Sequence, residues 1–555
     1  MSQIREVSVE KVTITVTGKK MTFRIRVFTF FMLSLNLSWA AESKPGWVNV
    51  YQSSVFEFPG PGSNYETVTA GRHPWLVGYF LNNLVSWDPQ DTLAPLPQDC
   101  SAKDLQKDLT QSLTAETYNK AFQDYAKKCE SKYVQAYRPP FLGLLGLFAM
   151  KYSLDENPFL RRTVIHLPNG QKLKAALALK DQKKRPFVIV RMGITGNVEE
   201  AYAERFFYHH LFERGFYHLL LVENLTSSDF LYNNKVMDFG GVSEAYQNIW
   251  IAERLRSKEE KISELVESVH LIGLSLGGQG VLASAWIAPA QPQKNTVQSY
   301  LGLCPLVDLK KTFNQLFIKN SLKYPLEFWA RSRFSEIQNF RSDLYTYDFG
   351  LTQRLLEASQ QSFKKPAVEY GLLEPEFMKA SNDFYFLHDL TQWDPEARED
   401  VRAWVTAQDQ IVPLELNSNN LDHLQPLVIA QGQHCSFPVE WHPHVTQALF
   451  NSHLLQNSKL QLEEISLQIQ NISEPGWEFE NVISGSEDSL QLILKSGNRE
   501  EKLKVERSQL DFKIPNGPID VFTLSVLKKW FSTNLKIHVD TVKSQMTVSW
   551  PFVRN

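Results

Sequence analysis

The sequence is poor in cysteine, has no excess of charge of either sign and lacks a long hydrophobic run. Its 58 basic and 61 acidic side chains leave a net charge of −3. With no basic run and no RNA-binding signature, nucleic acid is not an expected partner. Only four cysteines are present, and the spacing of Cys304 and Cys435 fits no metal site, so both are interpreted as buried small residues. No internal repeat or low-complexity tract is found.

The length of 555 residues is too great for one small core and predicts two or three domains. Apolar residues make up 43% and charged residues 21%, as in ordinary soluble globular proteins. We expect an N-terminal segment at residues 1–40, a mainly helical extension at 41–160, a central domain at 161–456 and a C-terminal α+β or β-rich module at 457–555.

The N-terminal segment has the order of a secretory signal. Positive charge comes first, from Lys19, Lys20, Arg24 and Arg26. An apolar run at 27–35 follows, and Ser38, Trp39 and Ala40 fit a small-x-small cleavage pattern. The run is short for a bilayer span, so no stable membrane span is expected. We therefore predict export to the periplasm or the extracellular medium, with Met21 as an alternative start. An uncleaved anchor, which would give a membrane-surface protein, remains an alternative.

Cys100 and Cys129 flank a stretch, 102–127, that is predicted to be helical. In an oxidising compartment they could form a disulfide. Two free, partly buried thiols are the alternative. No cysteine lies near the predicted cleavage site, which argues against a lipid-anchored protein.

The central domain begins with a hairpin and continues as alternating strands and helices. Strand-like runs at 163–167 and 173–179 flank Asn169 and Gly170, a strong hairpin signal. Further strands are expected at 187–192, 217–222, 268–273, 300–304, 401–406 and 427–430. This order predicts an α/β fold with a mostly parallel sheet. An aromatic-rich helical stretch at 309–397 interrupts the alternation and is interpreted as a lid.

A G-x-S-x-G motif joins the strand at 268–273 to the helix that follows it. Ser275 stands at its centre, with Gly273 and Gly277 on either side. Such a turn holds the serine in a strained backbone conformation, and small neighbours let strand and helix approach closely. The start of the helix favours developing negative charge. We therefore predict that Ser275 is a nucleophile and not an idle serine in a turn.

A serine nucleophile needs a base, and the base needs an acid that orients it. Asp409 and His434 each follow a predicted strand, where α/β sites lie. His423 is a weaker alternative base. Asp308 is a rival acid, although a helix-capping role is preferred for it. The remaining candidates, His442 and His444, are predicted to lie on the surface.

The oxyanion hole should consist of two backbone N–H groups. Leu276, directly after the nucleophile, should supply one. The loop at 192–197 follows an early strand, and Ile194 should supply the other.

The hairpin, the Ser275 turn and the loops of Asp409 and His434 together resemble the α/β-hydrolase superfamily. The resemblance covers about 161–456 and implies an eight-stranded, mostly parallel sheet. It also implies ester, amide or related hydrolysis without a metal or other cofactor. Many relatives begin the oxyanion loop with His-Gly, whereas this chain has Met192 and Gly193.

The sequence thus predicts an exported serine hydrolase that cleaves an ester or amide bond. The aromatic lid favours an apolar acyl or other small-molecule substrate. A peptidase or an acyltransferase would use the same three residues. An inactive binding protein that retains the fold is the alternative from a different class.

Overall fold

The computed structural model describes most of the chain and divides it into two compact units, Met1–Lys44 and Pro45–Asn555. The described residues are 11–16, 19–24, 48–59, 96–134, 160–180, 182–198, 204–213, 215–293, 296–319, 324, 327, 330–331, 334–345, 350–393, 398–417, 421, 424–432, 434–435, 437, 441–456, 461–486, 488–510, 524, 527–528, 531–532 and 535–554. None of the helices in these ranges has the length and apolar character needed to cross a membrane.

The first unit contains one antiparallel pair of strands. β1 (Lys11–Val16) pairs with β2 (Lys19–Arg24), and the alternative start Met21 lies within β2. The apolar run and the cleavage pattern predicted at 27–40 lie outside the described residues. The secretory signal therefore stays a prediction.

The second unit is built on a nine-stranded sheet in the order β3-β4-β5-β7-β6-β8-β9-β10-β11. Its strands are β3 (Phe56–Glu57), β4 (Leu160–His166), β5 (Lys172–Ala178), β6 (Arg185–Arg191), β7 (His218–Val222), β8 (Val266–Leu274), β9 (Ser299–Leu303), β10 (Val401–Thr406) and β11 (Leu427–Ile429). The strands from β7 to β11 in this order run parallel, and the β3–β4, β4–β5 and β5–β7 pairs are antiparallel. The predicted α/β class and the mostly parallel sheet are confirmed.

The sheet has one strand more than the eight expected. β3 adds to its edge, where Phe56 and Glu57 pair with Ile165 and Val164 of β4. Phe56 is buried, and the Glu57 carboxylate lies 2.7 Å from a ring nitrogen of His166. A two-residue strand is too short to produce a periodic pattern, so the sequence did not reveal it.

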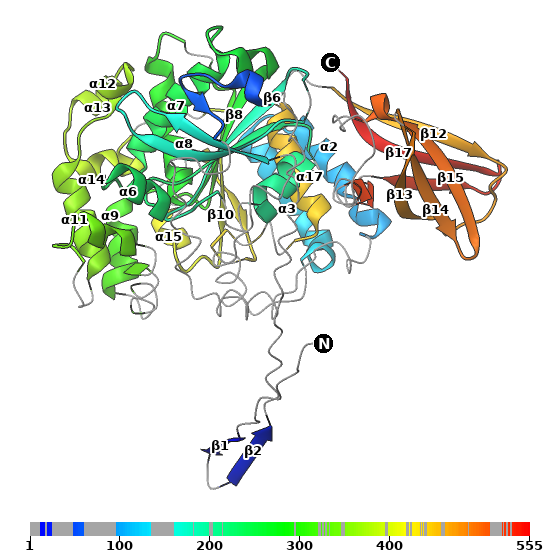
Figure 1. Cartoon of the computed structure of the whole chain (residues 1–555), viewed down its shortest axis with the longest axis horizontal. Helices are drawn as coiled ribbons and strands as arrows, with labels where there is room; N and C mark the ends of the chain where they lie inside the picture. Colours follow the sequence, from blue (N-terminus) through cyan, green and yellow to red (C-terminus); the bar gives the residue numbers. More distant parts are fainter. Residues whose placement is uncertain are drawn as a thin grey trace, which may run out of the picture. The chain divides into compact units, whose positions relative to one another are not determined.

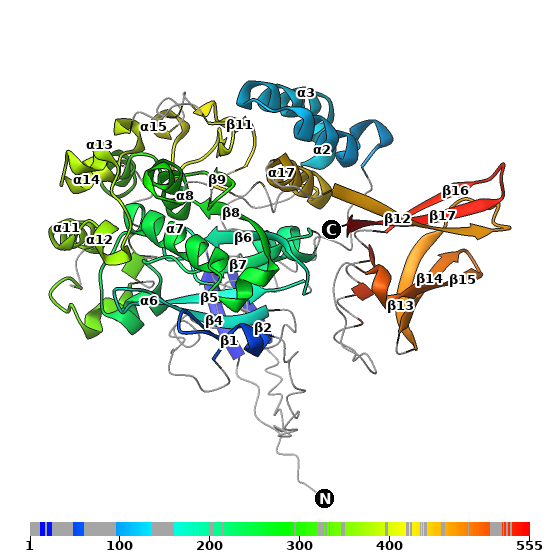
Figure 2. The same ribbon diagram turned by 90° about the horizontal axis from the view of Figure 1, so that it is seen from above.

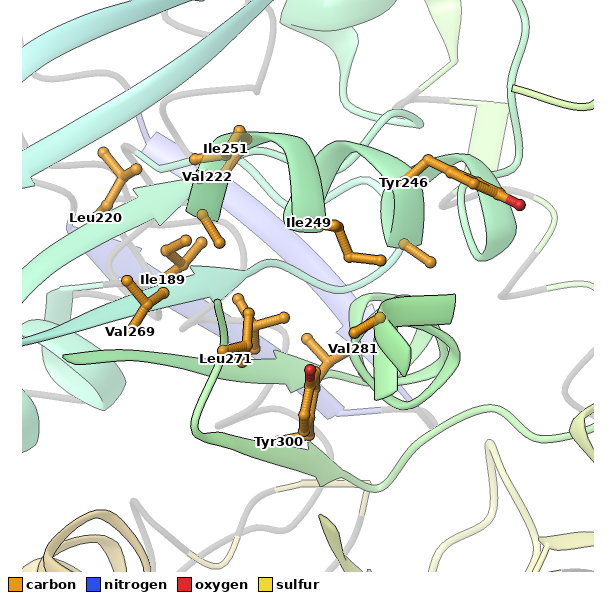
Figure 3. Packing of buried hydrophobic residues seen from close by; sticks show 14 of the residues in the cluster. Ile189, Leu220, Val222, Tyr246, Ile249, Ile251, Val269, Leu271, Val281 and Tyr300 are labelled. Atoms are coloured by element: carbon orange, nitrogen blue, oxygen red, sulfur yellow. The ribbon is translucent and has the colours of Figure 1, made fainter. Parts of the chain in front are cut away.

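Helices cover both faces of this sheet (Figures 1 and 2). Alternate residues of one strand enter different cores, since side chains alternate across a strand. Ile189 joins the core that includes α7 (Val242–Arg256) and α8 (Leu276–Ile287). Val188 and Val190 join the core of α2 (Ala102–Gln111), α3 (Ala115–Tyr133) and α17 (Pro443–Gln456). Figure 3 shows the first of these cores, where residues of β6, β7, β8 and β9 meet those of α7 and α8. The helices are α6 (Ser228–Asn234), α7 (Val242–Arg256), α8 (Leu276–Ile287), α15 (Leu414–Asn417), α17 (Pro443–Gln456), the π-helix η4 (Glu204–Glu213) and the 3₁₀ turns η1 (Val48–Tyr51), η5 (Lys261–Leu265) and η6 (Ala288–Ala290).

The N-terminal extension contributes two helices: the stretch expected at 102–127 is divided, and the second helix agrees with a helix-like run that the sequence also indicates at 114–132. α2 (Ala102–Gln111) ends before α3 (Ala115–Tyr133) begins. The break follows from local capping, because the Thr114 side chain accepts a hydrogen bond from the Thr117 N–H and starts a new helix. A disulfide joins Cys129 of α3 to Cys100 of the 3₁₀ turn η3 (Gln98–Cys100).

The described part of the stretch between β9 and β10 consists of short helices joined by turns and irregular segments, with one isolated bridge between Asp308 and Asp389. Its elements are α9 (Leu309–Asn314), the π-helix η7 (Gln315–Lys319), η8 (Ser335–Asn339), α11 (Leu351–Ser362), α12 (Ala367–Tyr370), α13 (Glu376–Lys379), α14 (Phe384–Leu387) and η9 (Leu390–Gln392). Whether this insertion acts as a lid stays a prediction.

The C-terminal module has two three-stranded antiparallel sheets, β12-β17-β16 and β13-β14-β15. Its elements are β12 (Gln461–Gln470), β13 (Glu478–Ser486), β14 (Ser489–Ser496), β15 (Arg499–Glu506), η11 (Arg507–Gln509), β16 (Lys536–Asp540) and β17 (Gln545–Arg554). Leu492, Phe531 and Trp550 belong to a core of its own. The helix predicted at 520–532 lies mostly outside the described residues.

Candidate active site

Ser275 lies at the tight turn between β8 and α8. Its backbone angles are φ 55° and ψ −115°, a region that a side chain makes costly. A Cβ atom on Gly273 would lie 2.2 Å from the Gly277 carbonyl oxygen, and one on Gly277 would lie 2.3 Å from the Met192 carbonyl oxygen. Both neighbours of the turn must therefore be glycine, as the motif predicts. The Ser275 N–H is fixed by the Leu303 carbonyl at 2.8 Å.

Asp409 and His434 form a hydrogen-bonded pair at the ends of two other strands. Asp409 follows β10, His434 follows β11, and the Asp409 Oδ2 atom lies 2.7 Å from His434 Nδ1. The other carboxylate oxygen, Oδ1, accepts the N–H groups of Ile411 and Val412 at 2.9 and 2.7 Å. Both Asp409 and His434 are buried, so the pair is held in one orientation with little access to water.

The carboxyl ends of β8, β10 and β11 meet at one edge of the sheet, because these strands run parallel. Ser275 and the Asp409–His434 pair therefore share that edge. The chain has the α/β-hydrolase fold. The Cys435 thiol lies against the backbone of Ser275 and links the two parts of the site. No hydrogen bond from the Ser275 hydroxyl to His434 is found among the described residues, and in free enzymes this bond is often long until substrate binds.

Comparisons with known proteins add little to this geometry. No family model and no curated protein matches the chain. Among solved structures, it is similar to an esterase of Pyrobaculum calidifontis (15% identity, 66% of this chain and 100% of the other, TM-score 0.33). It is also similar to Est1E from Butyrivibrio proteoclasticus (17% identity, 52% and 95%, TM-score 0.30). An esterase of Pyrococcus furiosus gives 16% identity, 54% and 96%, and a TM-score of 0.31. Because these identities and TM-scores are low, the fold is assigned from the strand order and the candidate site from its geometry.

The predicted oxyanion loop lies beside Ser275. A Cβ atom on Gly193 would approach Ser275 Cβ to 3.3 Å. Within this loop of the hydrolase fold, the Thr195 N–H donates to Thr226 Oγ1 and the Gly196 N–H donates to the Gly193 carbonyl. The Ile194 N–H makes no hydrogen bond to any part of the chain that the structure describes. Leu276 opens α8, and first-turn N–H groups have no partner within their helix.

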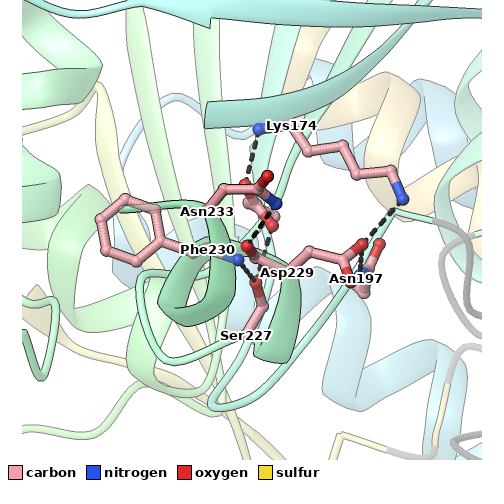
Figure 4. Close-up of polar contacts among 7 residues, drawn as sticks. Lys174, Asn197, Ser227, Asp229, Phe230 and Asn233 are labelled. Carbon is pink, nitrogen blue, oxygen red and sulfur yellow. Dashed lines mark hydrogen bonds and ion pairs between the residues drawn. The ribbon is translucent and has the colours of Figure 1, made fainter. Parts of the chain in front are cut away.

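A buried ion pair holds the far end of the loop (Figure 4). The Lys174 ammonium lies 2.8 Å from Asp229 Oδ2, and both side chains are fully buried. The Asn197 side chain donates to the same oxygen at 2.6 Å. One carboxylate thus ties strand β5, helix α6 and the oxyanion loop together.

A second buried acid lies behind the loop. Asn224 donates to the Met192 carbonyl at 3.0 Å and to Glu244 Oε1 at 2.8 Å. Burial raises the pKa of Glu244 to about 7, and the nearby Arg191 guanidinium offsets this only in part. Glu244 therefore changes charge near neutral pH within the support of the oxyanion loop.

The surroundings of the two predicted oxyanion donors are apolar. Leu276 and Ile194 belong to one cluster with residues of the insertion between β9 and β10. Aromatic members of this cluster are Phe239, Phe313, Phe317, Phe334, Phe340, Tyr345, Phe363, Phe384 and Tyr385. The start of α8 and the predicted oxyanion loop thus pack against apolar side chains of the insertion.

Of the four other residues considered for the base and the acid, three lie in the described part of the chain. Asp308 caps α9, where its side chain accepts the Lys311 N–H at 2.8 Å, as preferred for it. His423 lies outside the described residues. His444 is exposed, but the surface position expected for His442 is wrong. It is 6% exposed and its N–H donates to the Tyr133 carbonyl, because α3 packs over the start of α17.

Sequence reasoning missed two features of the site. Lys174 is a charged residue within an apolar strand, and a charge at such a position indicates a buried ion pair. Cys304 and Cys435 are buried as expected, but their separation along the chain concealed that both lie close to His434. Burial raises the pKa of the Cys435 thiol above its usual range.

Proposed function

We propose that this chain is an exported serine hydrolase that cleaves ester bonds through an acyl-enzyme on Ser275. The observation that carries the proposal is the strained Ser275 turn beside a buried Asp409–His434 pair at one edge of the sheet. A serine in a costly conformation next to an oriented imidazole is the arrangement that nucleophilic catalysis requires.

In the proposed mechanism, the Ser275 hydroxyl attacks the ester carbonyl carbon while His434 takes its proton. Asp409 holds the imidazole and stabilises its charged form. The N–H groups of Leu276 and Ile194 bind the carbonyl oxygen as it becomes negative. His434 then gives the proton to the leaving alcohol. Water, activated by His434, releases the acid and restores Ser275.

Two further observations support the substrate class and the compartment. The apolar cluster that contains Leu276 and Ile194 favours an ester with an apolar acyl or aryl group over a highly charged substrate. The Cys100–Cys129 disulfide suits an oxidising compartment, in agreement with the predicted signal segment.

The test is the hydrolysis of p-nitrophenyl esters from acetate to palmitate by protein that begins at Ala41. Ser275→Ala should lower the rate by about a thousandfold or more, because the nucleophile is lost while binding remains. A fluorophosphonate probe should label the wild type and not the variant.

Substitution of a buried serine outside the site supplies the control. Ser359, on α11, is also buried, and Ser359→Ala should keep the wild-type rate. Equal inactivity of wild type and Ser275→Ala, with no probe labelling, would contradict the proposal and favour a binding protein on this fold.

A further inference from the structure

Two thiols flank the proposed catalytic base. Cys304 follows strand β9 directly, and Cys435 follows His434 directly. One ligand atom from each of Cys304, His434 and Cys435 lies within 4.8 Å of the other two. Both cysteines are 1% exposed and neither forms a disulfide. Three donors of the N and S type thus converge in a buried space at the site.

The backbone holds both thiols in unusual conformations. Cys304 has φ 42° and Cys435 has φ 53°, a left-handed region that residues with a side chain seldom adopt. The Cys304 N–H is fixed by the Trp404 carbonyl at 2.7 Å. Such positions persist only where the surrounding structure determines them, and they gather at functional sites. The two thiols are therefore placed by the fold and do not simply fill a gap.

Two thiolates and an imidazole form a donor set that suits Zn²⁺ or Cd²⁺. A metal-binding imidazole generally gives its second nitrogen to a carboxylate, which orients the ring. His434 has this arrangement, since Nδ1 is bonded to Asp409 at 2.7 Å and Nε2 is left for a metal. Donors of a tetrahedral zinc ion lie roughly 3.5 Å apart, whereas the three donor atoms here lie within 4.8 Å of one another, so binding draws them together by up to about 1.3 Å.

We propose that Cys304, Cys435 and His434 form an inhibitory site for a thiophilic divalent metal. The ion binds the two sulfurs and His434 Nε2, and the two thiol protons pass to solvent. Ser275 then has no base, because the nitrogen that should take its proton is bound to the metal. The inhibition rests on the proposed function, whereas the binding does not.

The first measurement is a cadmium titration of the full exported chain, followed by the ultraviolet absorbance of cadmium–thiolate bonds. We expect saturation at one ion per chain, with two protons released. Ester hydrolysis should fall in parallel and return when a chelator is added. The denatured protein should contain two free thiols per chain. An absence of these thiols, or of the absorbance band at one equivalent of cadmium, overturns the proposal.

Variants identify the ligands. Cys304→Ala and Cys435→Ala should each reduce the absorbance change and weaken cadmium binding by at least roughly a hundredfold, because the loss of an outer-shell partner alone costs up to about that much. His434→Ala should weaken it similarly, whereas His444→Ala, which replaces an exposed histidine, should bind as the wild type does. Cys304→Ser is a second variant with a smaller change in side-chain size, and circular dichroism checks its fold. Unchanged binding in the folded cysteine variants overturns the assignment.

Ser275→Ala separates the two proposals. It should bind cadmium with the wild-type absorbance although it hydrolyses no ester. A normal cadmium band in a wild type without esterase activity would contradict the proposed function and leave the metal site standing. Full esterase activity that saturating cadmium does not change would contradict the inhibitory site alone.

Discussion

Glu244 is a fully buried carboxyl group whose ordinary pKa of 4.5 rises to about 7 in the folded protein, mainly through burial. Between these pH values the folded state keeps a proton that the unfolded state has released. Stability therefore falls as pH rises through this window. The arrangement places a proton-binding group two hydrogen bonds from the oxyanion loop, through Asn224.

Glu244→Gln should remove this part of the pH dependence. The amide oxygen can still accept from Asn224 and the Leu225 N–H, as the carboxylate does, but it cannot lose a proton. From about pH 4.5 to about pH 8, the unfolding free energy of the wild type should fall by on the order of 3 kcal/mol relative to that of Glu244→Gln.

Urea unfolding at several pH values measures this difference. Glu376→Gln replaces an exposed acid and should follow the wild type throughout. Parallel curves for wild type and Glu244→Gln would show that Glu244 does not titrate in this range.

At the scale of elements, one carboxylate connects β5, α6 and the oxyanion loop. Asp229 accepts from Lys174 and Asn197 at a fully buried position. Removing one partner of a buried pair leaves the other charge poorly compensated, which is costly even where the intact pair adds little. The loop that carries Ile194 should therefore depend on α6 for its position.

Asp229→Asn should lower the unfolding free energy by about 3–5 kcal/mol. In the protein that remains folded, kcat for ester hydrolysis should fall while KM stays near its wild-type value, because the loop acts on the transition state. Denaturant unfolding and steady-state kinetics measure the two effects.

The exposed pair Lys379–Glu376 serves as the comparison for Asp229→Asn. Its loss should cost no more than about 1 kcal/mol. If Lys174→Met restores none of the stability lost in Asp229→Asn, the uncompensated charge is not the cause.

The elements were predictable where local pattern decides them. The strands β6 to β10 follow from continuous apolar runs, since buried parallel strands show them. β3 has two residues and α6 has seven, so neither shows a clear periodic pattern of apolar residues.

Ser275, Asp409 and His434 could be proposed from the sequence motif and from their order along the chain. The contacts Lys174–Asp229 and Cys304–His434 could not, because they depend on which strands lie side by side.

For the molecule as a whole, the described residues of the C-terminal module pack into a core that no residue of the hydrolase-fold core joins. We therefore expect the module to unfold in a transition of its own. Trp550→Ala removes a fully buried ring of this core and should destabilise that transition by about 3–5 kcal/mol.

Calorimetry should show one transition moved and the other in place, with ester hydrolysis unchanged. Phe187→Ala, in the sheet core, should move the other transition instead. A common shift of both transitions in Trp550→Ala would mean that the two parts unfold as one.

The disulfide near the N-terminus also has a consequence for how the chain matures. Four cysteines allow six different single disulfides, and only Cys100–Cys129 is bonded here. In a chain that crosses a membrane N-terminus first, these two emerge together, long before Cys304 and Cys435. The bond can close between consecutive cysteines while the later thiols are still absent. If the chain is exported as proposed, correct pairing follows from the order of arrival, and we expect maturation to need an oxidase but no isomerase.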